Sequence, residues 1–171
     1  MNNFGIDKRI IIAIIMALLA YQVIASGKNE LLILILSIPG VFIAFTFHEY
    51  AHALVADKLG DDTPRMQGRL TLDPTKHIDW LGFVFLLIAK FGWAKPVQIN
   101  PNNFNRKMSV SKAEALVSLA GPLANLIVAF IVMIINAILF KTNILVNTSY
   151  GIYVEFAVLQ IVLMNIGLRS I

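Results

Sequence analysis

Long stretches without a charged side chain are the feature that most restricts how this chain can fold. Residues 10–26 and 31–47 contain no Asp, Glu, Lys or Arg, and further apolar blocks follow at residues 111–140 and 150–168. Of the 171 residues, 58% are hydrophobic, against about 45–50% in a soluble domain. A helix needs about 20 apolar residues to cross a bilayer. The sequence therefore predicts an all-α polytopic membrane protein, with about four spanning helices in a single domain covering residues 1–171.

Two shorter segments between these blocks have patterns of their own. Residues 81–92 begin apolar but are too short for a comfortable span, so they are predicted to form a re-entrant or interfacial segment. Residues 66–72 roughly alternate apolar and polar side chains, which predicts a short strand-like loop. Residues 10–26 could also be read as a signal peptide, but the apolar core is long and lacks a small residue two positions before a cleavage site.

The positive charges are distributed unevenly between the loops. If residues 81–92 do not span, only Lys28 and Lys141 lie on one side of the membrane. The other side carries Lys8, Arg9, Lys58, Arg65, Arg69, Lys76, Lys90, Lys95, Arg106, Lys107, Lys112 and Arg169. Because cytoplasmic loops carry the excess of Lys and Arg, this predicts a multi-pass protein of the cell membrane with a cytoplasmic N-terminus. The basic residues are not interleaved with aromatic ones, which argues for a lipid bilayer and against nucleic acid as the partner.

One short motif places three ionisable groups inside an apolar block. Residues 48–52 read H-E-x-x-H. Residues four apart leave the same face of a helix, so His48 and His52 can hold one zinc ion, beside which Glu49 can act as general base. Ionisable groups at membrane depth cost several kcal/mol unless they are partnered or functional. The alternative is a pair of solvent-facing or packed histidines, which would not require this order of all three groups.

A catalytic zinc site normally has three protein ligands and one water, so a third ligand is expected. The chain contains no Cys, which leaves His and carboxylates. Glu155 is predicted to lie near the opposite membrane face, and Asp57 is too far along the helix from His48. His77 and Asp79 are predicted to be solvated loop residues. None of these residues is predicted as the third ligand.

The motif is one of several segments that resemble a known family. The chain is similar to the site-2 proteases, which are intramembrane zinc metalloproteases, and most of all to short bacterial members without added domains. The resemblance extends over nearly the whole chain. It is carried by residues 45–53, 56–61, 68–74, 77–79 and 94–97, and by the Gly-Pro-x-x-Asn element at residues 120–125.

This resemblance implies a site and an activity. It implies that His48 and His52 bind Zn²⁺ and that Glu49 is the general base. The implied substrate is a transmembrane segment of another protein. It also implies that Asn125 helps to organise the substrate, with a packing amide as the alternative role.

The chain departs from the family pattern at its end. In the family the third ligand is an aspartate in a C-terminal Asn-x-x-Pro…Leu-Asp-Gly motif, and this chain stops at Ile171, about where that motif should begin. We therefore expect residues 1–171 to be a C-terminally truncated metalloprotease-like domain. The alternative is an inactive membrane-binding or scaffold relative that lacks the third zinc ligand. A transporter would explain a buried Glu155 but not the spacing of the motif.

Overall fold

The structure is a computed structural model and describes residues 8–89, 93–142, 148 and 150–167. Its long helices are α1 (Lys8–Lys58), α3 (Trp80–Ala89), α4 (Val110–Lys141) and α5 (Gly151–Gly167), joined by the short α2 (Thr63–Met66) and the 3₁₀ helices η1 (Pro74–Lys76) and η2 (Pro101–Asn103). No β-strand occurs within these ranges. The all-α prediction is therefore confirmed.

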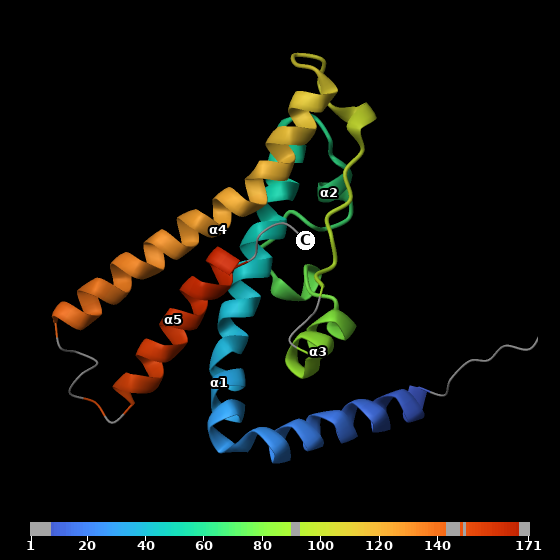
Figure 1. Ribbon diagram of the computed structural model, residues 1–171. Coiled ribbons are helices and arrows are strands. Elements are labelled where there is room, and N and C mark those ends of the chain that lie inside the picture. Colours follow the sequence, from blue (N-terminus) through green and yellow to red (C-terminus); the bar gives the residue numbers. More distant parts are fainter. Residues whose placement is uncertain (1–7, 90–92, 143–147, 149, 168–171) are drawn as a thin grey trace, which may run out of the picture.

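The first two apolar blocks lie in one helix rather than two. Helix α1 runs without interruption from Lys8 to Lys58, and its N-terminal part turns sharply away from the rest (Figure 1). Among the described residues, Leu32–Lys58 of α1 and Val110–Lys141 of α4 are long and apolar enough to cross a membrane. Helix α5 is apolar but shorter.

Helix α4 meets α1 along a single face. Its buried residues recur at every fourth position: they are Ala113, Val117, Gly121, Asn125 and Ala129. Residues four apart stack on one side of a helix, so this stripe forms a continuous contact surface. Most of its members are small, which lets two helix backbones approach closely. The stripe thus fixes which α4 residues can reach the middle of α1.

Helix α5 packs against α1 through a glycine. A Cβ added to Gly40 would lie 3.1 Å from the Cα and the backbone nitrogen of Ile161. Helix α5 also runs in the same direction as this part of α1 (Figure 1). Because the atoms facing Gly40 belong to backbone rather than to a flexible side chain, a larger residue could be accommodated only if the two helices separated.

We therefore expect Gly40→Leu to destabilise the helical core by about 1–3 kcal/mol, the usual cost of overpacking. Thermal unfolding in detergent would measure the loss. Gly167→Leu is the matched control, because a Cβ added at Gly167 meets no described atom within 4 Å. Equal stability of the two variants would show that α5 does not pack on Gly40 as described.

The prediction of a strand-like loop at residues 66–72 is wrong. Pro64 lies in the first turn of α2, where a missing N–H costs nothing. Gly68, with φ of +67°, then ends that helix: its N–H donates to Arg65 O, and the Arg69 N–H donates to Pro64 O over 2.8 Å. This is the Schellman pattern of a helix C-terminus. The first part of the alternating apolar and polar pattern at residues 66–72 therefore lies at the C-terminal end of α2 and not in a strand.

The loops on either side of α3 are joined to each other. The Asp61 carboxylate is fully buried and accepts hydrogen bonds from the backbone of Thr63 and Asn100 and from the Asn103 side chain. The Asn105 N–H donates to Leu59 O over 2.7 Å. The chain therefore leaves the end of α1 and, after α3, returns to the same place before α4 begins.

Helix α3 occupies the segment expected to be re-entrant or interfacial. It begins where the Asp79 carboxylate accepts the N–H groups of Leu81 and Gly82, at 2.9 and 3.0 Å. Its Phe83 ring packs on Phe42 of α1, with 5.1 Å between the ring centroids. The end of the expected segment, residues 90–92, lies outside the described residues. An isolated antiparallel bridge between Ile78 and Ala94 joins the segments that precede and follow α3.

Candidate metal centre

Helix periodicity brings the two motif histidines together on α1. The ring centroids of His48 and His52 are 4.7 Å apart, and the rings meet edge to face at 81°. Both side chains are half-buried. They face α4 rather than solvent, because that helix supplies the atoms around both rings.

The two rings pack directly against Gly121. A Cβ added there would lie 2.6 Å from His48 Nε2 and would also overlap His52 Nε2. Both Nε2 atoms therefore lie beside the same point of α4, here called the Gly121 space, which only a residue without a side chain leaves to the rings. A zinc–nitrogen bond is about 2.0–2.1 Å long, so one ion can bind two nitrogens up to about 4 Å apart, and two Nε2 atoms that meet at one point suit a shared ion.

His52 is held in the form that a metal ligand requires. Its Nδ1 lies 2.6 Å from the carbonyl oxygen of Val117, one turn before Gly121. A carbonyl oxygen only accepts hydrogen bonds, so Nδ1 must carry the proton. In a neutral imidazole the lone pair is then on Nε2, the atom that faces the Gly121 space. The residues present thus fit a zinc ion.

His48 has a side-chain partner on α4, the helix that also carries Val117. The amide nitrogen of Asn125 lies 3.2 Å from His48 Nδ1. Asn125 has no exposed surface, and its Oδ1 has no hydrogen-bond partner. The residue whose expected role is to organise substrate therefore lies behind a motif histidine.

Glu49 is oriented by the segment that follows α3. Its carboxylate is 7% exposed, and Oε2 accepts a hydrogen bond from the Val97 N–H over 3.0 Å. The preceding Pro96 keeps this segment extended across α1. One carboxylate oxygen is thereby fixed, which leaves Oε1 to bond to a water or a substrate group.

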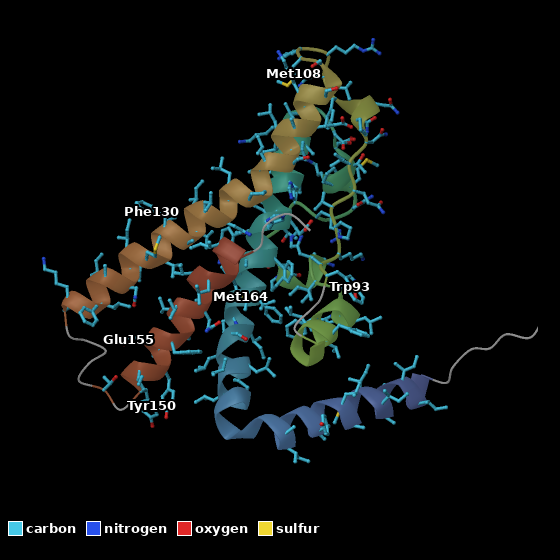
Figure 2. The ribbon with its side chains drawn as sticks, viewed as in Figure 1. Trp93, Met108, Phe130, Tyr150, Glu155 and Met164 are labelled. Carbon is cyan, nitrogen blue, oxygen red and sulfur yellow. The ribbon has the colours of Figure 1, made fainter. Side chains whose placement is uncertain are left out.

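No third ligand joins the two histidines among the residues that the structure describes. Glu155 lies on α5 near Tyr150, far from the place where α1 meets α4 (Figure 2). Asp57 is paired with Arg65 at 2.7 Å near the end of α1. These positions agree with the expectation that neither carboxylate is a ligand.

His77 has a structural environment in the loop before α3. It is fully buried, and its Nε2 lies 2.7 Å from Thr71 O. Burial lowers its pKa, so the ring is neutral near pH 7. The neighbouring Arg69 is also buried and donates to the carbonyl groups of Lys76 and Lys95. The prediction that His77 is solvated is therefore wrong: it belongs to a packed loop, outside the motif site.

Three elements of this site were not identified from the sequence. Gly121 was noted only within the Gly-Pro-x-x-Asn element, without a role at the metal centre, and Val117 and Val97 contribute only backbone atoms. Backbone contacts leave no signature in residue type. Gly121 does have a sequence signal. A glycine inside a long helix lowers helix stability, so its presence usually indicates close packing or a function at that position.

Two histidines lie four residues apart on one helix, their Nε2 atoms meet at Gly121, and a buried glutamate is adjacent to the first of them. This arrangement is typical of zinc-dependent peptidases. Comparison with known proteins agrees with this class. The chain belongs to peptidase family M50, the site-2 proteases, whose profile matches residues 36–169.

Curated relatives carry names of the same kind. "Putative zinc metalloprotease YwhC" of Bacillus subtilis is 52% identical over 91 residues, which are 53% of this chain and 40% of that protein. "Putative zinc metalloprotease Rip2" of Mycolicibacterium smegmatis is 33% identical over 104 residues, 59% of this chain and 39% of the relative. The matched part of this chain thus spans about two fifths of these relatives. No solved structure matches the chain.

Proposed function

We propose that this chain forms the zinc-binding core of an intramembrane metalloprotease that hydrolyses peptide bonds in transmembrane segments of other proteins. The observation that carries the proposal is the convergence of His48 Nε2 and His52 Nε2 on the space over Gly121, with the Glu49 carboxylate one residue away. Membership of the M50 family and the names of the relatives support a protein substrate and zinc.

The apolar surface of α4 supports a location in the membrane. The most apolar 18-residue window of its span has a mean hydropathy of 2.7, yet only 11% of that window is buried. Large side chains such as Leu119, Leu123 and Phe130 are exposed on it. A soluble monomer seldom exposes so long an apolar surface, whereas lipid chains would cover it at no cost. We propose a multi-pass cell-membrane protein with about four spans and a cytoplasmic N-terminus, in which the two apolar blocks of α1 count as two spans and α3 does not cross.

We propose the following roles for the side chains in peptide hydrolysis. Zinc, when held by His48 and His52, supplies a Lewis acid that polarises a carbonyl group and acidifies water. Glu49 takes the proton from the attacking water through its free Oε1 and later delivers it to the leaving amine. The Val97 N–H holds the other oxygen, so the carboxylate is already oriented when substrate arrives. A contact between Asn125 and substrate stays a prediction.

The third ligand is proposed to come from residues beyond Gly167. Ile161 lies beside Gly40, and both helices run in the same direction. Measured from Gly40, His48 is about 12 Å further along α1. Measured from Ile161, the end of α5 is about 9 Å further in the same direction, whereas Glu155 is about 9 Å back towards the start of α5. The chain thus leaves α5 near the level of the site, where the aspartate of a Leu-Asp-Gly motif could reach it.

The test of the proposed function compares residues 1–171 with a form extended by a segment bearing that aspartate. With two protein ligands, we expect zinc to be held weakly and cleavage of a transmembrane substrate to be undetectable. The extended form should hold a full equivalent of zinc and cleave the substrate. Zinc content after dialysis and cleavage in the same detergent are the measurements.

Two outcomes would contradict this proposal. If residues 1–171 alone bind zinc tightly and cleave, a ligand within this chain has been missed. If a full-length protein with every ligand present binds zinc but cleaves nothing, the scaffold alternative replaces the protease.

The proposed topology predicts that the two loops bordering α3 lie on one side of the membrane. Asp62 and Asn102 are exposed residues of these loops, and the chain has no native cysteine. Asp62→Cys and Asn102→Cys should both react with an impermeant thiol reagent from the cytoplasmic side only. Thr142→Cys, at the other end of α4, is the control and should react only from the outside. Labelling of positions 62 and 102 from opposite sides would reject the topology.

A further inference from the structure

Asn125 contacts a proposed zinc ligand, His48, through an amide that is only partly hydrogen-bonded. It lies one turn after Gly121 on the buried stripe of α4, so it sits directly behind the space that the two Nε2 atoms face. Its Nδ2 is 3.2 Å from His48 Nδ1, while its Oδ1 is buried without a partner. A buried, unpartnered carbonyl costs about 1–3 kcal/mol, so its presence beside a proposed ligand needs an explanation.

The two histidines are not held in the same tautomer. The Val117 carbonyl requires a proton on His52 Nδ1 and leaves its Nε2 free. In contrast, an amide N–H can only donate, so the Asn125 nitrogen requires a lone pair on His48 Nδ1. A neutral His48 then carries its proton on Nε2, the atom that faces the Gly121 space. In this form His48 cannot bind a cation through Nε2.

A half-turn of the amide reverses the preference of His48. The nitrogen and oxygen of a carboxamide occupy almost the same volume, so they can exchange places without repacking. Oδ1 would then accept a hydrogen bond from His48 Nδ1–H, and Nε2 would present its lone pair. The proton leaves Nε2 to water and another is taken up at Nδ1, so the ring stays neutral.

We propose that Asn125 is a positioning residue that sets the tautomer of His48 through the orientation of its amide. With the nitrogen facing Nδ1, as in this structure, a neutral His48 carries its proton on Nε2; with the oxygen facing Nδ1, Nε2 is free to bind zinc. The same exchange gives the buried Oδ1 a donor and moves the amide nitrogen to the place that Oδ1 occupied. This inference rests on the proposed function only in taking His48 and His52 as the zinc ligands.

The residue type at this position suits such a role. Leucine has a similar shape but offers neither donor nor acceptor. Aspartate offers acceptors alone, so it would hold His48 permanently with the proton on Nδ1. Only a carboxamide of this length can serve both forms of the ring.

The first measurement is zinc affinity of the full-length protein in detergent, by competition with a chromophoric chelator. We expect Asn125→Leu to weaken zinc binding about 10–100-fold, as loss of an outer-sphere partner does. Asn125→Asp should bind zinc at least as tightly as the unchanged protein. Asn136→Leu is the matched control, because Asn136 lies three turns further along α4 and also has a buried, unpartnered Oδ1. It should leave the affinity unchanged.

The second measurement reads the tautomer of His48 by ¹⁵N NMR of histidine-labelled protein. The signals of His48 are those that disappear in His48→Ala. The unchanged protein should show the proton on Nε2 without zinc and on Nδ1 with zinc. Asn125→Asp should show it on Nδ1 in both states, which a merely structural role for Asn125 would not produce.

Several results would overturn the inference. They are an Asn125→Leu protein that binds zinc normally, an equal loss in Asn136→Leu, or a proton on Nδ1 before zinc is added. If Asn125→Leu raises only the KM for substrate, the residue contacts substrate instead. Should Asn125→Leu fail to fold, the Asn125→Asp spectra still decide. Undiminished zinc binding by His48→Ala would be a different failure, because it would place the metal elsewhere and reject the proposed function.

Discussion

Replacement of Glu49 by glutamine is expected to abolish peptide cleavage and to leave zinc binding and fold intact. Glutamine has the same shape, and its carbonyl oxygen can still accept the Val97 N–H that orients the side chain. What the substitution removes is the ability to take a proton from water. General-base catalysis contributes about 10²–10⁴-fold to a rate, so cleavage should fall at least that far.

The experiment uses a full-length protein, a transmembrane substrate and a zinc assay on the same sample. His48→Ala is the comparison, because it should lose both zinc and activity. A Glu49→Gln protein that still cleaves at the original rate would show that another group activates the water. A Glu49→Gln protein that loses zinc would show that Glu49 acts on the metal rather than on the proton.

Gly121→Ala is expected to eliminate zinc binding although it changes a single methyl group. The new Cβ would lie within 2.6 Å of His48 Nε2 and against His52 Nε2, so both rings would have to leave the position in which they could share an ion. The loss should exceed the roughly 10–100-fold that follows removal of an outer-sphere partner. Alanine favours helix over glycine by about 1 kcal/mol, so poor helix formation cannot account for the effect.

The checks are a zinc titration and a thermal unfolding curve in the absence of zinc. We expect the variant to be no less stable than the unchanged protein without zinc if the histidine rings can turn aside. A variant that binds zinc with normal affinity would show that the ion does not lie over Gly121. The proposed metal centre would then have to be rebuilt around another face of α1.

Features that depend on neighbouring residues were predictable here. The H-E-x-x-H spacing placed two rings on one helix face, since helix periodicity is local, and the resemblance to site-2 proteases is confirmed by the family match. The expected strand at residues 66–72 failed for an equally local reason. Alternation over a few residues also occurs at a helix end, and a left-handed glycine decides between the two.

Features that depend on the packing of distant segments were not predictable. The Val117 carbonyl is separated from His52 by 65 positions and the Val97 N–H from Glu49 by 48. Both are backbone groups, so these two contacts cannot be predicted from the type of residue at positions 97 and 117. The single helix α1 was also missed, because the apolar blocks were divided at a polar segment that a helix can nevertheless contain.

The buried stripe of α4 has a thermodynamic consequence. Val117, Gly121 and Asn125 occupy successive turns of the same face that packs α4 against α1. The contact between the helices and the environment of both rings are therefore formed in one step. An ion that binds only the docked pair must strengthen docking by linkage, by about 2.7 kcal/mol at a free concentration one hundred times its Kd. Zinc should thus favour the packing of α4 on α1 although α4 supplies no ligand, and chelation should loosen α4 before it affects α3.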